Sequence, residues 1–394
     1  MTRSLNTYYL VNFLYNFARV LPHSILTILL MGKGITLAEI SLIQSFYMLT
    51  ALVSEFPSGV LTEIIGEKKM YQLSLILLGI SYCGVYVFDN VLLLSLMWGI
   101  YGLSSAVMSG TLDAYFYKVI KKKGKNIKEF NVKNRYSILV SSLFGALIGS
   151  LLYKYIGVSI YLVSIIILIL TLLILTFFIK IEHELILEKV NNNSVSYQIK
   201  QIIKETLALK SDLKLMYLIF LTCTFQIVVQ LYFQYWQVFF QQKGVKIAYF
   251  GVIYALFQVI AITSTYVFSK CKFKKTPFKL IVGLLGLISF PLLFSIFSSN
   301  VIFFIVFFTI FLLAFNVYDN VLEYLILHNV KSQYMSSFMS LFGTLSTVVS
   351  TIILWMMSIF LSFQTLENVG VFLIIIFLIL SLVICYRYYL VDRK

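Results

Sequence analysis

Long apolar stretches separated by short polar segments make up nearly the whole chain. A run of about 20 apolar residues, coiled as a helix, is long enough to cross a hydrocarbon core about 30 Å thick. The stretches do not alternate between apolar and polar positions with a period of two, as the strands of a membrane barrel do, so the pattern predicts helices. Twelve membrane-spanning helices are predicted, at residues 7–31, 38–61, 70–88, 91–117, 135–155, 158–179, 213–240, 247–269, 278–297, 300–327, 334–362 and 367–389.

The longest polar interruption lies midway, at residues 180–212. It holds the segment NNNSVS and then YQIKQIIKETLAL, whose apolar residues have the spacing of an amphipathic helix that lies on a membrane surface. We therefore predict an N-terminal half of six helices at residues 1–179, a cytoplasmic linker at 180–212 and a C-terminal half of six helices at 213–394.

Composition and charge agree with this interpretation. Hydrophobic residues make up 60% of the chain and charged residues only 12%, against about 25% charged residues in soluble domains, so an integral membrane protein is indicated. Of the 31 Lys and Arg residues, Lys33, Lys154, Lys243 and Lys246 fall on one side of the predicted helices and Arg19 falls within a helix, which leaves 26 on the other side. Because short cytoplasmic loops carry the excess of basic residues, both termini are predicted in the cytoplasm.

The net charge of +15 needs no nucleic acid to explain it. The most basic run, residues 118–135, is an alternative candidate for an RNA or DNA patch, but it lies between two predicted helices on the cytoplasmic side, where contact with anionic lipid is expected. The four cysteines are scattered and lack the spacing of metal ligands. No metal, cofactor or disulfide is predicted.

Two short matches indicate an internal repeat. SLFG occurs at residues 142–145 and again at 340–343, and DAYFYK at 113–118 aligns with EYLILH at 323–328. The matches lie 198 and 210 residues apart, and each falls in equivalent helices of the two predicted halves. We therefore predict an all-α membrane protein of two pseudo-symmetric six-helix halves, an arrangement typical of secondary transporters whose substrate site lies between the repeats.

Polar residues inside the predicted helices concentrate in the first, fourth, seventh and tenth of them. A charged group in hydrocarbon costs about 2.5 to 3.5 kcal/mol, so these residues are expected to face a protein interior or a water-filled cavity. The four helices are therefore predicted to wall a central cavity. Their polar residues are Asn12, Asn16, Arg19 and His23; Ser105, Ser109 and Asp113; Gln226, Gln230, Gln234 and Gln237; and Asn316, Asp319, Asn320 and Glu323.

One polar segment resembles a family signature. The segment SEFPSGVLTEIIGEKK at residues 54–69, called the signature segment below, is similar to the motif G-x-x-x-D-x-x-G-R-K between the second and third helices of the major facilitator superfamily. Glu63 stands where that motif has Asp, and Glu67 stands where it has Arg. SGTLDAYFYK at residues 109–118 is similar to a helix-4 motif of a small-molecule efflux subgroup, with Lys118 in place of an Asp.

The resemblance implies the twelve-helix fold, transport by alternating access and a set of gating or coupling residues. Glu63 is expected to hold a cytoplasmic latch with the eleventh helix and neighbouring basic residues. Gly59 and Gly66 are expected to permit close backbone approach and a tight turn, and Glu55 is expected to be a gate partner or an interfacial acid. Asp113, Asp319 and Glu323 are candidate proton carriers, and Arg19 is their candidate partner. The alternative is a permanent structural ion pair between Arg19 and one of these acids.

Amide and aromatic side chains are the candidates for substrate contact. Amides both donate and accept hydrogen bonds, and aromatic rings offer stacking faces. The alternative is that the amides join neighbouring helices. The predicted substrate-binding residues are Asn12, Asn16, Gln226, Gln230, Gln234, Tyr232, Trp236, Asn316 and Asn320.

The predicted function is proton-coupled export of a small amphipathic or cationic compound across the cell membrane of a bacterium, by a monomer. Proton-coupled uptake of a nutrient such as a sugar, peptide or metabolite is the alternative within transport. A membrane-embedded enzyme or a lipid scramblase is the alternative from another class, but the chain has no HExxH, GxSxG or phosphate-loop motif, so no enzyme is predicted.

Overall fold

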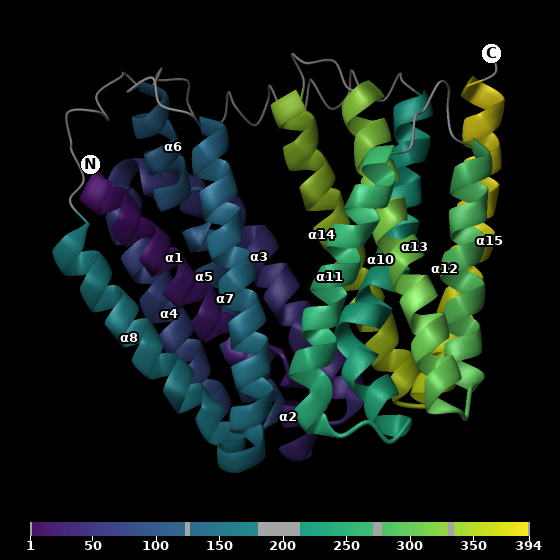
Figure 1. Ribbon diagram of the computed structural model, residues 1–394, viewed down its shortest axis with the longest axis horizontal. Helices are drawn as coiled ribbons and strands as arrows, with labels where there is room; N and C mark the ends of the chain where they lie inside the picture. The colour runs from purple at the N-terminus through teal and green to yellow at the C-terminus, as the bar shows by residue number, and fades with distance from the viewer. Residues whose placement is uncertain (1, 123–126, 180–212, 271–277, 330–334, 393–394) are drawn as a thin grey trace. The chain divides into compact units, whose positions relative to one another are not determined.

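The computed structural model describes residues 2–122, 127–179, 213–270, 278–329 and 335–392, and helices account for nearly all of them (Figure 1). No strand occurs in these ranges. The predicted linker at residues 180–212, with its amphipathic helix, lies outside them. The chain divides into two compact units, one of residues 1–189 and 246–255 and the other of residues 190–245 and 256–394.

The helices of the first unit alternate long spans with two short segments. They are α1 (Thr2–His23), α2 (Leu26–Gly32), α3 (Leu37–Ile65), α4 (Glu67–Val87), α5 (Val91–Met108), α6 (Leu112–Lys122), α7 (Ile127–Ile156) and α8 (Ile160–Phe178). A 3-10 turn at Gly157–Ser159 joins the last two.

The six helices that follow the linker are all long enough to cross a membrane. They are α10 (Leu213–Gln242), α11 (Phe250–Lys270), α12 (Phe278–Phe297), α13 (Val301–Asn329), α14 (Met335–Leu361) and α15 (Leu366–Asp392). A 3-10 turn at Ile247–Tyr249 precedes α11, whose first turns group with the first unit.

The span count agrees with the prediction of twelve. Ten described segments are long and apolar enough to cross a membrane, and the bent pair α1 and α2 makes eleven. One of the ten, Val132–Phe178, is 47 residues long and contains both α7 and α8. Since a single crossing needs about 20 residues, this segment crosses twice and the described residues supply twelve spans.

Two predicted helices are broken. The helix predicted at residues 7–31 bends by 49° between α1 and α2, directly after Pro22, because proline lacks the N–H and crowds the carbonyl four residues earlier. The helix predicted at 91–117 stops at Met108 and restarts at Leu112. Gly110 lies between them at φ +69°, a left-handed conformation that ends a helix.

The predicted basic loop is shorter than expected. Residues 127–134, which were predicted to lie outside the membrane helices, form the first turns of α7. The predicted loop at 62–69 is shorter still, because α3 runs to Ile65 and α4 begins at Glu67. Gly66 is the only residue between them.

Four helix pairs recur in both units, although the extensive pair of α3 and α5 has no match of similar extent between α11 and α13 in the described residues. In the first, α1 packs against α7 and α8, while α4 packs against α5 and α8. In the second, α10 packs against α14 and α15, while α12 packs against α13 and α15. The two units therefore share these four pairs of equivalent helices, as the internal repeat predicts.

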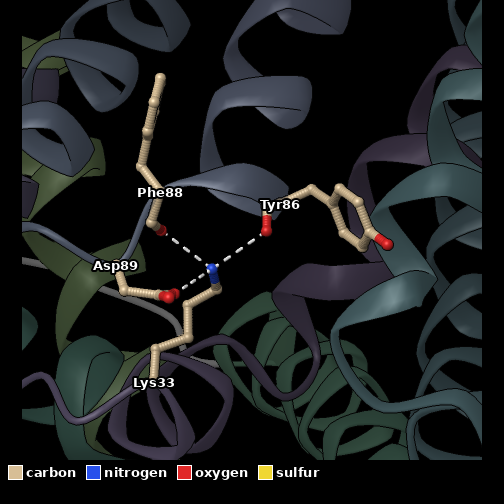
Figure 2. A network of polar contacts seen from close by, with 4 residues as sticks. All are labelled: Lys33, Tyr86, Phe88 and Asp89. Carbon is tan, nitrogen blue, oxygen red and sulfur yellow. Dashed lines mark hydrogen bonds and ion pairs between the residues drawn. The ribbon is translucent and has the colours of Figure 1, made fainter.

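A lysine closes the corresponding loop in each unit. Figure 2 shows Lys33 donating to the carbonyls of Tyr86 and Phe88, at 3.2 and 2.9 Å, and to the carboxylate of Asp89 at 2.7 Å. The three N–H groups of the ammonium thus meet three acceptors at the C-terminal end of α4, where a helix carries partial negative charge. In the second unit Lys243 donates to the carbonyl of Ile296, at the end of α12, over 2.9 Å.

The neighbouring residues repeat with the same spacing of 210 residues that separates Lys33 from Lys243. Gly34 and Gly244 follow the lysines at φ +84° and +81°. Asn90 accepts from the amides of Leu92 and Leu93, and Asn300 accepts from those of Ile302 and Phe303. The repeat therefore extends from helix packing to single hydrogen bonds. It also gives a structural role to Lys33 and Lys243, two of the four lysines on the predicted outer side.

Candidate functional site

The main polar cluster of the first unit joins three helices. Tyr8, Asn12 and Asn16 come from α1, Asp113 from α6 and Asn134 from α7. The residues on α1 are four apart, so their side chains lie one above the other on one helix face. The cluster brings together three predicted site residues, Asn12, Asn16 and Asp113.

A continuous set of hydrogen bonds runs through this cluster. The hydroxyl of Tyr8 donates to the carboxylate of Asp113 and also lies 3.0 Å from Oδ1 of Asn134. Nδ2 of Asn12 donates to the same Asn134 oxygen over 2.5 Å, and Nδ2 of Asn16 donates to Oδ1 of Asn12 over 2.8 Å. A tyrosine hydroxyl has one proton, so Asp113 and Asn134 compete for it.

Asp113 occupies the junction between the buried cluster and an open surface. It is the second residue of α6, three positions after Gly110, and its side chain is exposed. Tyr8, in contrast, is fully buried, with its ring 4.7 Å from that of Phe116. The carboxylate is therefore accessible on one side while a buried hydroxyl holds it on the other.

Arg19 lies further along α1, among tyrosines. Its guanidinium carbon is 5.9 Å from the centre of the Tyr15 ring, and the hydroxyl of Tyr82 donates to its main-chain carbonyl over 3.3 Å. Within the described first unit, no carboxylate lies within ion-pair distance of Arg19. The ion pair with Asp113, one of the alternatives that the sequence left open, is therefore absent from the described first unit, where Asp113 is bound to Tyr8 instead.

Beyond Arg19 the aromatic packing continues to His23. Its ring stacks on Trp98 with centroids 6.3 Å apart, and Nε2 lies 3.2 Å from the hydroxyl of Tyr101. Tyr101 also packs against Tyr47, with centroids 4.9 Å apart. These contacts enclose the last turns of α1 in an aromatic shell.

In the second unit, the amides of α10 are mostly buried. Gln230 and Gln234 are 4% and 8% exposed. Gln226 is half-buried, and its Oε1 accepts a hydrogen bond from Ser350 of α14 over 3.1 Å. The Gln226 contact is the kind of helix-to-helix bond that was the alternative to substrate contact.

Tyr232 and Trp236 belong to an aromatic core. Tyr232 is 7% exposed and lies within 6.0 Å, centroid to centroid, of Phe257 and Phe308. Trp236 is 4% exposed, with its ring 5.0 Å from that of Phe257. This placement favours packing within the unit over contact with a substrate.

The polar residues of α13 divide into two kinds. Nδ2 of Asn316 and Nδ2 of Asn320 donate to carbonyls of their own helix, four residues earlier, over 2.7 and 2.8 Å. Asp319 and Glu323 are exposed, while Tyr318, the residue before Asp319, is fully buried in the core of the unit. Neither acid has a cation within ion-pair distance in the described second unit.

The signature segment is a helix end, a one-residue turn and a helix start. Gly66 has φ +94° and ψ 148°, a conformation that side chains rarely adopt, which confirms the expected need for glycine there. Gly59 lies inside α3, and among the described residues of its unit nothing would lie within 4 Å of a Cβ added to it, so no close approach within the first unit requires glycine there. Glu55 is exposed, and the side chain of Glu63 lies outside the described part of the chain.

The two charged residues that follow Gly66 have distinct partners. Glu67 is buried, and its Oε1 is 3.7 Å from Nζ of Lys118 on α6. Lys68 donates to the carbonyls of Thr176 and Ile179, at the end of α8, over 2.9 and 2.6 Å. Lys68 thus caps a helix of its own unit.

Sequence reasoning missed two members of the polar cluster. Tyr8 continues the four-residue spacing of Asn12 and Asn16 toward the N-terminus, and this spacing was the signal that could have identified it. Asn134 falls in a run of basic residues that was predicted to be a loop, and only the early start of α7 brings it to α1.

Two pseudo-repeated units of membrane-spanning helices, each with polar residues on its first and fourth spans, define a class of membrane transport proteins. The chain matches the family model for the Major Facilitator Superfamily over residues 8–354, and it belongs to that family. A comparison with curated proteins found no match.

Solved structures of transporters share the fold. The nucleoside transporter NupG has a TM-score of 0.78 at 12% identity, over 98% of each chain. A bacterial homolog of the human lysosomal transporter Spinster has a TM-score of 0.72 at 10% identity, over 99% of this chain and 96% of that one. The peptide transporter POT in complex with sulfate has a TM-score of 0.71 at 14% identity, over 99% and 95%.

Proposed function

We propose that this member of the superfamily exports a small amphipathic or cationic compound in exchange for protons, by alternating access. The observation that carries the proposal is the hydrogen bond from the buried hydroxyl of Tyr8 to the exposed carboxylate of Asp113. A group that is open to water on one side and bound to the helix core on the other has the placement that a proton carrier needs.

Protonation of Asp113 changes what its carboxyl group does in the cluster. As a carboxylate it accepts a hydrogen bond from the Tyr8 hydroxyl; once protonated, it gains a donor and is a much weaker acceptor. Tyr8 then turns to its second acceptor, Oδ1 of Asn134, which lies 3.0 Å away. The contact between α1 and α6 is weakened, while the contact between α1 and α7 is kept.

The interruption between α5 and α6 is the position about which α6 moves in this proposal. Gly110 has φ +69°, and nothing in the described residues lies within 4 Å of the position of its missing Cβ. In this proposal α6 moves about Gly110 when Asp113 releases Tyr8, which links proton binding to a movement of the helix.

A cationic guest is supported by the acids of the second unit. Asp319 and Glu323 lie one turn apart on α13 and are exposed without a cation in their unit. Asn316 and Asn320 lie on the same helix, and their side-chain oxygens keep acceptor capacity because their bonds to the helix carbonyls use the Nδ2 atoms. In this proposal the four residues form the substrate-facing side of α13.

Proton-coupled uptake of an anionic metabolite is the second candidate, and Arg19 favours it. A guanidinium with no carboxylate partner in its unit is suited to bind a carboxylate or phosphate of a substrate. In both versions the protein works as a monomer in the cell membrane of a bacterium with both termini in the cytoplasm, as its basic residues suggest.

Proton movement in proteoliposomes tests the proposal. A pH dye inside the vesicles is followed while a lipophilic cation, ethidium, or an aromatic anion, benzoate, is supplied outside. In antiport, entry of the compound expels protons and the internal pH rises; in symport it falls. The Asp113→Asn variant should remove the pH change, whereas Asp89→Asn, in the loop after α4, should keep it. A pH change of equal size with Asp113→Asn would overturn the role of Asp113.

A further inference from the structure

The two positions at which the chain departs in charge from the family pattern face each other. Glu67 stands in place of an Arg and Lys118 in place of an Asp, and the structure brings their side chains to 3.7 Å. We propose that Glu67 and Lys118 form an ion pair of reversed polarity that positions α6 and, with it, Asp113. Both residues are positioning residues in this proposal.

The burial of Glu67 makes a partner necessary. Its side chain is 9% exposed, and a buried carboxylate without a counter-charge is costly. Glu67 is the first residue of α4, where the free N–H groups stabilise a negative charge. Gly66, the residue at the helix cap, has no side chain to bind these groups, and Lys118 is the one cation in ion-pair distance of Glu67 among the described residues.

Because Lys118 is exposed and Glu67 is buried, the two residues contribute differently to the stability of the ion pair. The Lys118 side chain is 72% exposed, so its charge stays solvated and forming the pair desolvates the lysine little. An ion pair between two exposed groups contributes about 0 to 1 kcal/mol, whereas removal of the partner of a buried charge is more harmful. Loss of Lys118 is therefore expected to act mainly by leaving Glu67 buried alone.

Lys118 and Asp113 hold α6 from different sides. Five residues of an α-helix turn it through about 500°, so the two side chains point about 140° apart. On one side Asp113 accepts the hydrogen bond from Tyr8 of α1, and on the other Lys118 meets Glu67 of α4. Because α6 is separated from α5 at Gly110, which has φ +69°, these two contacts hold the short helix on two sides after the interruption.

The consequence for transport rests on the proposed role of Asp113, but the ion pair itself does not. If complementary charge is what matters, the pair should work with either polarity. Glu67→Arg with Lys118→Asp restores the charges of the family pattern, and each single substitution places two like charges together.

The test measures the position of α6 directly. Spin labels are attached to Tyr117→Cys on α6 and Leu73→Cys on α4, residues that are 41% and 38% exposed, after the four native cysteines are replaced by serine. Distances between the labels are measured by pulsed electron resonance in nanodiscs. Glu67→Arg and Lys118→Asp should each shift or broaden the distance distribution, and the double variant should return it to that of the native pair. Lys69→Glu, a charge reversal at an exposed neighbour, is the matched control and should change nothing.

If the protein with the reversed charges does not fold, a variant in which both residues are uncharged provides a second test. Lys118→Gln leaves Glu67 without a partner and should shift or broaden the distribution, while Glu67→Gln with Lys118→Gln should return it toward the native one. Distributions that are unchanged in both single variants, or a double variant that is no better than the singles, would overturn the proposal. A native distance pattern with rescue, but no proton movement in any variant, would instead count against the proposed proton coupling alone.

Discussion

The hydroxyl of Tyr8 donates a hydrogen bond to the carboxylate of Asp113, 105 residues further along the chain. The bond joins the first helix of the protein to α6, a short helix that is separated from its predecessor at Gly110. In the proposed mechanism, it is the contact through which a proton on Asp113 changes the packing of the first unit.

Tyr8→Phe should therefore uncouple transport while the fold is kept. The substitution removes only the hydroxyl, so the ring still packs against Phe116 and Phe130. A hydrogen bond to a charged group contributes about 1.5 to 3 kcal/mol, and the midpoint of thermal unfolding should fall accordingly. Proton movement in proteoliposomes should fall more steeply than stability. Tyr9→Phe, at the neighbouring ring, is the control and should resemble the native protein in both measurements.

Two glycines of the signature segment should respond in opposite ways to alanine. Gly66→Ala forces a side chain into a conformation with φ +94°, which costs about 1 to 3 kcal/mol. Gly59→Ala adds a methyl group with nothing within 4 Å in the described structure and raises helix propensity, so stability should be unchanged or higher by about 0.5 to 1 kcal/mol. Thermal unfolding of the two variants in the same detergent gives the comparison. A Gly66→Ala variant with the same unfolding temperature as the native protein would show that a side chain does not strain the turn at Gly66.

The lysines on the predicted outer side should rank by the number of acceptors that each ammonium meets. Lys33→Met loses three hydrogen bonds and should destabilise the protein by about 2 kcal/mol. Lys243→Met loses the bond to the carbonyl of Ile296 and should have a smaller effect. Lys154→Met, which loses only a contact with the exposed ring of Tyr155, should be close to neutral. A reversed order in unfolding temperatures would contradict the capping role.

Arg19→Gln separates the two candidate functions. If the substrate is a cation, loss of the guanidinium should leave binding of the cation unchanged or tighter, because a like charge is removed. If the substrate is an anion, binding should weaken by a factor of about 10 or more, as expected for loss of a charge-assisted hydrogen bond. Equilibrium binding of ethidium and of benzoate to the native protein and to the variant provides the measurement. Arg19→Lys, which keeps the charge, is the control.

The sequence was informative about the spans because membrane helices depend on length and hydropathy, both of which are local. Residues 278–297, for example, were predicted with the bounds that α12 has. The break before α6 was not predicted, because SGT within an apolar run is compatible with a continuous helix, and the conformation of Gly110 depends on what α6 contacts. The equivalent stretch of α13 continues unbroken, so the repeat gave no sign of the interruption within the span that was predicted at 91–117.

Candidate site residues were harder to predict than spans because a polar residue in a membrane helix has several possible partners. Asp113 and Asn12 are brought into one cluster, as their helices suggested, but Tyr232 and Trp236 pack into an aromatic core instead. Spacing along one helix shows which side chains share a face. It does not show which neighbouring helix lies opposite, and Asn134 was missed for that reason.

The coupling role of Asp113 is tested most directly by comparing substrate exchange with substrate accumulation in the same vesicles. Once a transported compound is known, Asp113→Asn should still exchange labelled for unlabelled compound across the vesicle membrane, since exchange needs no net proton movement. The same variant should not concentrate the compound when a pH gradient is imposed, whereas the native protein does both. If Asp113→Asn accumulates the compound as the native protein does, Asp113 does not carry the coupling proton and the account is contradicted.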